Sequence, residues 1–283
     1  MNFPEQSEAR FENAPKREDT QMKTYMLACL ALLLACCYVM PTLADHHEAG
    51  EMEMLQFPES YKAMAVSNGG TISGTVTFEG DVPEMKVLEI TKDEAVCGLT
   101  EKHDESLVVG EGNALKNTIV YLIDISQGKA LDKKTKPEID QKGCKFTPHV
   151  QIVPVGVRLT MLNNDRVNHN VHIFSSVNKP VNKQQTKNRK KMQLAGVKKA
   201  EGPVQMKCDI HGWMSAWLAY VPHPYFAVTD EMGKFTLEDV PPGTYQLGYW
   251  HEACGTNSKE PATVTVEAGG TVTQDFTLSM KKM

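Results

Sequence analysis

The sequence predicts an all-β protein made of two sandwich-like modules. Short runs that alternate apolar and polar residues recur between positions 69 and 278. Clusters that contain Gly, Pro and Asn separate these runs, and no segment beyond an amino-terminal apolar stretch has convincing helical periodicity. The 283 residues carry a formal net charge of −5, and 41% of them are hydrophobic. This balance is typical of a chain of one to three globular domains and provides no basic excess for nucleic acid.

Residues 1–44 are expected to form a leader that contains a signal peptide. Within it, a positive charge precedes an apolar run, and Thr42-Leu43-Ala44 places small residues at a cleavage site. The polar residues ahead of this pattern favour Met22 as the true start. Two alternatives stay open: Leu33-Leu34-Ala35-Cys36 weakly resembles a lipobox, and the apolar run could anchor the chain uncleaved. All three interpretations place the body in the periplasm or otherwise outside the cytoplasm.

Residues 45–70 are acidic and lack clear periodicity, so we expect a flexible linker. Cleavage after Ala44 would leave Asp45, His46 and His47 at the new amino terminus. There a free amine, backbone nitrogens and a third-position imidazole can bind Cu(II) in a square plane. A solvated polar tail is the simpler interpretation of these residues.

The β pattern begins with residues 71–106, which open on an alternating run at 71–78. Further strand candidates lie at 107–109 and 117–123. The charged, proline-containing stretch 129–142 is expected to be a surface loop. The remaining strand candidates, in chain order, are 146–150, 153–162, 215–221, 225–229, 234–237, 244–250 and a pair within 262–278.

Four of the seven cysteines lie outside the leader: Cys97, Cys144, Cys208 and Cys254. If Cys208 binds a metal, an exported protein would form one disulfide from the other three and keep one free thiol. We favour Cys97 with Cys144, because each precedes a strand-like run while Cys254 lies in a different turn. The alternative is that all three are buried free thiols.

The strongest functional signal is Cys208-x-x-His211-x-x-Met214, with His169 about forty positions earlier. A thiolate, two imidazoles and a weak axial thioether are the donors of a type 1 copper site. Asn170 follows the first histidine, and its amide is expected to brace the strand against the cysteine loop. His172 lies three residues from His169 on the same expected strand, so it points to the opposite face and is not included among the ligands.

The stretch around these residues resembles the cupredoxins of the plastocyanin and amicyanin type, over roughly residues 107–222. Phe146-x-Pro148 and His169-Asn170-Val171 follow the plastocyanin order, and the 208–214 loop has the short amicyanin spacing. The resemblance implies a Greek-key β-sandwich with one copper ion. By this resemblance the copper ligands are His169, Cys208, His211 and Met214, with His211 as the exposed ligand through which electrons leave.

The tail is similar to a second family, the carboxypeptidase regulatory-like β-sandwich, which is non-catalytic. The similarity rests on Gly233-x-Phe235-x-Leu237 followed by Pro241-Pro242-Gly243-x-Tyr245. This small module is expected at 223–283. In this family a Gly-x-Val strand opens the sandwich, and here such a strand lies far upstream, within residues 71–106. Residues 71–106 are therefore expected to pack with the carboxyl-terminal module. The combination resembles bacterial exported proteins of the methylamine-utilisation type.

These features predict an exported type 1 copper protein that transfers single electrons and is not an enzyme. The alternatives are a periplasmic protein that binds or delivers copper, and a non-catalytic interaction module of the cell envelope. The expected partner is a redox protein such as a cytochrome or dehydrogenase, which would dock at the basic loop 179–199. The simpler alternative is that these lysines only contact solvent and bind no partner. A membrane is expected to be involved only through an uncleaved or lipidated leader.

Overall fold

The computed structural model describes residues 53–281, so the leader and the terminus at Asp45, His46 and His47 lie outside the described residues. The all-β class is confirmed. Within the described range the helical elements are the four-residue α2 (Glu94–Cys97) and the 3₁₀ turn η1 (Glu111–Asn113). Between residues 53 and 281 no helix has the length and apolar character needed to cross a membrane.

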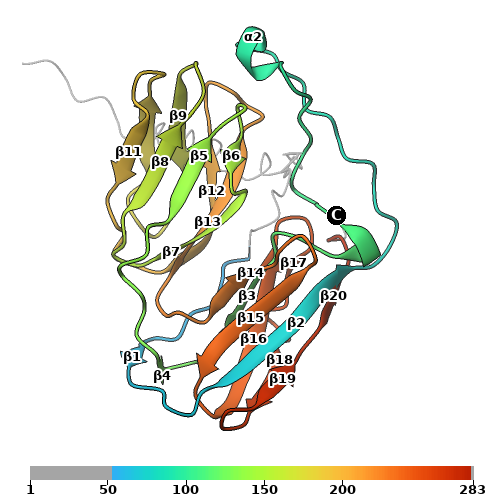
Figure 1. Cartoon of the computed structure of the whole chain (residues 1–283), viewed down its shortest axis with the longest axis vertical. Coiled ribbons are helices and arrows are strands. Elements are labelled where there is room, and N and C mark those ends of the chain that lie inside the picture. The colour runs from blue at the N-terminus through green and yellow to red at the C-terminus, as the bar shows by residue number, and fades with distance from the viewer. Residues whose placement is uncertain (1–52, 282–283) are drawn as a thin grey trace, which may run out of the picture. The chain divides into compact units, whose positions relative to one another are not determined.

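The first sandwich consists of a five-stranded sheet in the order β10-β9-β12-β13-β7 and a four-stranded sheet in the order β11-β8-β5-β6 (Figure 1). Alternating side chains such as Met161, Ile173 and Met206 point inward and are buried between the two sheets. The strands are β5 (Glu138–Gln141), β6 (Phe146–Thr147), β7 (Val150–Pro154), β8 (Leu159–Asn163), β9 (His169–Ile173), β10 (Val181–Gln185), β11 (Lys191–Leu194), β12 (Glu201–Lys207) and β13 (Ser215–Val221).

The second sandwich combines strands from both ends of the described chain. One sheet has the order β14-β3-β16-β17 with β18 beside β16, and the other has the order β15-β2-β19 with β20 beside β2. Ile72, Val120 and Leu247 are buried in its core. The strands are β2 (Gly70–Phe78), β3 (Ile119–Leu122), β14 (Phe226–Val228), β15 (Lys234–Val240), β16 (Gly243–His251), β17 (Gly255–Thr256), β18 (Ala262–Val266), β19 (Thr271–Thr273) and β20 (Phe276–Leu278).

Strand pairing differs from the expected domain boundaries in two places. β3 pairs with β14 and β16, so the part of 107–222 that contains it belongs to the second sandwich. Of residues 71–106, β2 pairs with the carboxyl-terminal strands, whereas 79–106 does not join that sheet. All four residues of β3 are buried. A strand without polar alternation carries no signal for which of two sheets it enters.

The expected linker 45–70 is also partly wrong. Leu55 is buried in a third cluster with Trp217 and Trp250, and its N–H donates to the carbonyl of Gly202 at 2.6 Å. Further along, β1 (Lys62–Ala63) pairs in parallel with β4 (Gln127–Gly128). The apolar residues in this polar stretch show no periodicity, yet they are sufficient to attach the stretch to the two sandwiches.

Two buried histidines predict acid sensitivity. Burial lowers the pKa of His223 to about 3 and that of His251 to about 4. Below the ordinary histidine pKa the unfolded chain binds protons that the folded chain does not. The free energy of unfolding therefore decreases by roughly 1.4 kcal/mol for each histidine and for each unit by which the pH is lowered. Urea unfolding at pH 7 and pH 5 should show this loss, and His223→Gln should reduce it. An equal loss in both proteins would contradict the assignment.

Candidate metal centre

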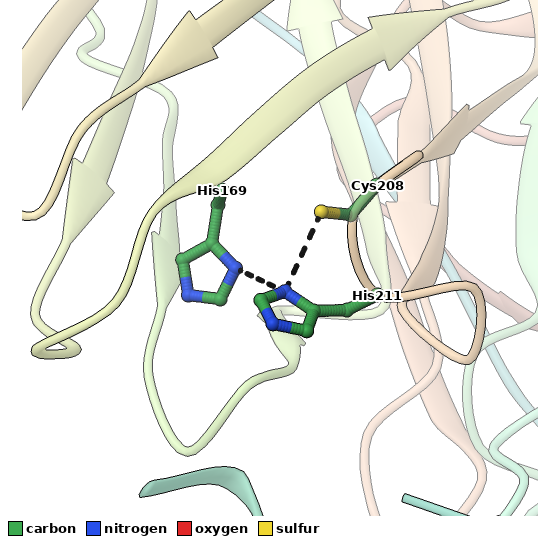
Figure 2. A group of neighbouring side chains, drawn as sticks. All are labelled: His169, Cys208 and His211. Atoms are coloured by element: carbon green, nitrogen blue, oxygen red, sulfur yellow. Dashed lines mark hydrogen bonds between the residues drawn. The ribbon is translucent and has the colours of Figure 1, made fainter. Parts of the chain in front are cut away.

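Three of the four predicted ligands meet at one end of the first sandwich (Figure 2). His169 is the first residue of β9, while Cys208 and His211 lie in the ligand loop, residues 208–214, between β12 and β13. One donor atom from each of the three lies within 4.8 Å of the others, and none of the side chains is more than 1% exposed. The group can therefore enclose a metal ion away from water.

The ligand loop is closed by its own backbone. The N–H of Cys208 donates to the carbonyl of Met214 at 3.2 Å, and the N–H of Met214 donates to the carbonyl of His211 at 2.9 Å. The Met214 side chain is buried in the same apolar cluster as Cys208. All four predicted ligands are thus buried at this end of the sandwich.

Each histidine is held by a carboxylate through its outer nitrogen. Nε2 of His169 contacts Asp165 at 2.9 Å, and Nε2 of His211 contacts Asp93 at 2.9 Å. The two Nδ1 atoms face each other at 3.0 Å, and Nδ1 of His211 lies 3.7 Å from the Cys208 sulfur (Figure 2). A carboxylate on Nε2 fixes the ring and leaves Nδ1 as the nitrogen for a metal.

The charges around His169 form one coupled group. Burial raises the pKa of Asp165, but hydrogen bonds from His169 and from the backbone N–H groups of Cys144 and Gly143 outweigh it and keep the pKa below its ordinary value. Burial lowers the pKa of His169, but Asp165 and Cys208 outweigh it and raise the pKa. A proton shared between the facing Nδ1 atoms of His169 and His211 would be displaced by a cation bound there.

Cys208 is prepared as a thiolate. Burial raises the pKa of its thiol, but hydrogen bonds from His169 and His211 and from the Asn170 N–H outweigh burial and leave the pKa at about 6. The Asn170 N–H lies 3.5 Å from the sulfur. The deprotonated sulfur is the form that binds metal.

Asn170 links β9 to the ligand loop. Its side-chain oxygen accepts hydrogen bonds from the N–H groups of Asp209 at 2.6 Å and Ile210 at 3.4 Å. Its amide nitrogen donates to the Asp209 carboxylate at 2.9 Å and to Asn182 at 2.8 Å. His172 lies outside the ligand group, with Nδ1 2.9 Å from Asp209. These contacts fix the loop that carries three of the predicted ligands.

His211 is covered, which corrects the expectation of an exposed exit ligand. Its side chain is fully buried, with the Trp213 ring centroid 5.0 Å away and Asp93 on its outer nitrogen. Asp93 belongs to a cover segment, residues 87–104, that includes α2. Asp93 and His211 are 118 residues apart in the chain. No local spacing in the sequence relates them.

The cover segment is attached by a disulfide between Cys97 and Cys144, 47 residues apart. The Cys97 N–H donates to the carbonyl of Asp93 at 2.8 Å, and the Cys144 N–H donates to the carboxylate of Asp165 at 2.8 Å. The disulfide therefore joins two cysteines whose N–H groups donate to the two aspartates that hold His211 and His169. Cys144, Asp165 and His169 also approach one another, but the Cys144 sulfur is committed to the disulfide.

Removing this disulfide should destabilise the protein. A cross-link across 47 residues restricts the unfolded chain, and the loop-entropy relation gives about 4 kcal/mol for that span. The double variant Cys97→Ser and Cys144→Ser should lose a comparable amount of unfolding free energy in urea. A loss below about 1 kcal/mol, well under the usual range, would show that the cover segment is held by other contacts.

About a third of the chain is similar to solved cupredoxin structures. These include a copper-containing nitrite reductase from Thermus scotoductus SA-01 (18% identity, 34% of this chain, 24% of that chain, TM-score 0.29). They also include a reduced Cu(I) amicyanin variant (19%, 32%, 86%, TM-score 0.27) and a purple cupredoxin from Nitrosopumilus maritimus (17%, 30%, 100%, TM-score 0.25). The matched region spans about a quarter of the nitrite reductase chain.

The second sandwich has a different similarity from the one expected. Residues 221–274 match the family described as polysaccharide lyase family 4, domain II. The expected carboxypeptidase regulatory-like family is not shown for this module. No curated protein matches the sequence.

Proposed function

We propose that this chain holds one copper ion in a type 1 site and passes single electrons through it. The observation that carries the proposal is the convergence of two imidazoles and a low-pKa thiolate within 4.8 Å, all buried. His169, Cys208 and His211 would bind the ion, and Met214 would be the weak axial ligand. This mixture of soft and borderline donors suits copper in both oxidation states, so little rearrangement accompanies electron transfer.

The donor set fits copper better than zinc. A closed zinc site takes four strong ligands from Cys, His and carboxylates. Here Asp93 and Asp165 are occupied by the outer nitrogens of the two histidines, which leaves the Met214 thioether as the fourth protein donor. A thioether is a ligand that copper accepts and that structural zinc sites do not normally use.

The covered site favours electron transfer over copper delivery. Delivery requires donor atoms of an acceptor protein to reach the ion, whereas an electron can cross a thin layer of protein. His211 and Cys208 are almost completely buried, and the cover segment is fixed by the Cys97–Cys144 disulfide. The disulfide also supports an exported, oxidising location such as the periplasm, where such bonds persist.

The partner in this proposal is a redox protein, such as a cytochrome or dehydrogenase, with an acidic docking face. The expected basic loop 179–199 contains β10 and β11, and the turn between these two strands, residues 186–190, lies beside the His169 end of the site. There the Lys187 N–H donates to the side chain of Asn168 at 2.9 Å, and Lys190 Nζ donates to the carbonyl of Asp165 at 3.4 Å. The position of this turn supports docking of the partner close to His169, a proposed copper ligand.

Cycling the copper-loaded protein between ascorbate and ferricyanide in the presence of a Cu(I) chelator tests the proposal. We expect the visible colour to disappear and return over many cycles, with one copper per chain retained. Transfer of copper to the chelator on the first reduction would favour delivery and contradict electron transfer. Failure to bind copper stoichiometrically would contradict both and favour the cell-envelope module.

A further inference from the structure

A cavity of about 640 Å³ opens at the end of the first sandwich opposite the ligand loop. Leu159 is the first residue of β8 and Leu194 the last of β11, while Ile173 ends the strand that His169 begins. All three line the cavity. The volume is within the range of pockets that bind small ligands.

The cavity exists because the sandwich is not closed on one side. β10 is the edge of the five-stranded sheet and β11 is the edge of the four-stranded sheet, and these two consecutive strands do not pair with each other. Apolar side chains from both sheets are therefore reachable between them at this end. Val157 and Val197 extend the apolar lining toward the loops.

Lysines surround the opening. Lys179, Lys183, Lys198 and Lys199 line the cavity and are exposed, and none of them forms a salt bridge with a carboxylate in the described part of the chain. Alternation along β10 puts Lys183 on the same face as the buried Gln185. Its apolar stem can line the cavity while its ammonium group stays in water.

A tyrosine hydroxyl that makes no hydrogen bond within the described residues lines the cavity. Tyr220 is only 5% exposed and lines the cavity, yet its hydroxyl makes no hydrogen bond to any described residue. Burial and the neighbouring Glu201 carboxylate raise the pKa of Tyr220, so the hydroxyl remains a donor. The hydroxyl is therefore free to donate a hydrogen bond to an acceptor group on a ligand in the cavity.

We propose that this cavity binds one small amphipathic anion, an alkyl carboxylate whose chain lies between the sheets. Its carboxylate would accept the Tyr220 hydrogen bond and neutralise the lysine rim. The apolar lining accounts for the alkyl chain, and the unpaired lysines and the hydroxyl account for a charged acceptor at its head. The apolar floor of the cavity lies at the far ends of the strands from His169, and Asn182, which donates to Asp209 at 2.8 Å, is the lining residue that contacts the ligand loop.

Isothermal titration calorimetry of the full chain with decanoate tests the proposal. We expect saturable binding of one decanoate per chain. Decanol, which has the chain but no charge, and hexanoate, which has the charge but a shorter chain, should each bind more than about tenfold more weakly. No saturable decanoate binding, or decanol binding as tightly as decanoate, would overturn the proposal.

Two variants locate the binding. Tyr220→Phe keeps the shape but removes the donor, and should weaken decanoate binding about fivefold. Lys183→Glu should weaken it about tenfold. Lys191→Glu is the matched control: it makes the same charge change on the next strand, but β11 alternation directs Lys191 away from the buried Met192 face. Equal affinities of the Lys183→Glu and Lys191→Glu proteins, or an unchanged affinity in Tyr220→Phe, would place binding elsewhere.

Discussion

Cys208→Ser is expected to abolish the intense visible absorption of the Cu(II)-loaded protein. The colour of a type 1 site comes from charge transfer between the thiolate and copper, and a serine oxygen is not a soft donor of this kind. The substitution is nearly isosteric, so the copper-free variant should remain folded. Absorption spectroscopy during titration with Cu(II), together with circular dichroism of the copper-free protein, measures both outcomes.

Cys254→Ser is the matched control for this substitution. Cys254 is a free, partly buried cysteine of the second sandwich, and burial raises the pKa of its thiol to about 11. It carries the same chemical change outside the ligand group. Its colour should equal that of the unmodified protein. Visible absorption that persists in Cys208→Ser, or that disappears in Cys254→Ser, would contradict the proposed ligand set.

Asp93→Asn should speed the loss of copper. The substitution replaces the carboxylate that holds Nε2 of His211, and the loss of such an outer partner typically costs about 10–100-fold in metal affinity. The colour itself should persist, because Cys208 is unchanged. Asp93 has a left-handed backbone with φ 51°, which Asn also adopts readily. The rate at which the chelator EDTA removes the colour measures the effect.

Glu94→Gln provides the comparison for Asp93→Asn. Glu94 is the next residue, is exposed, and carries the same charge, but it makes no hydrogen bond to either ligand histidine within the described residues. Removing its charge should leave copper loss unchanged. Identical rates of copper loss from the Asp93→Asn and Glu94→Gln proteins would mean that Asp93 does not position His211. If both rates were as slow as that of the unmodified protein, burial alone would protect the site.

The sequence was sufficient to predict the ligand loop, because its spacing is local. Cys208, His211 and Met214 repeat every three residues, and the strand that carries His169 is marked by alternation. The cover over His211 had no such signal. Asp93 contacts the histidine across 118 residues, and a single carboxylate in an irregular segment is indistinguishable from any other surface acid.

The limits of the fold prediction have a similar cause. Alternation identified most strands and the all-β class, but it does not state which sheet a strand joins. The fully buried β3 and the attached Leu55 show this, because both are placed by contacts with residues far along the chain. The open edge between β10 and β11, which forms the lysine-rimmed cavity, depends equally on how the two sheets meet.

We propose that His169, Cys208 and His211 bind one copper ion together. X-ray absorption at the copper edge, combined with electron paramagnetic resonance of the Cu(II)-loaded protein, tests it most directly. We expect one short copper–sulfur bond, two copper–nitrogen bonds and the small hyperfine splitting of a type 1 centre. A copper environment of nitrogen and oxygen alone, with an ordinary large splitting, would contradict it.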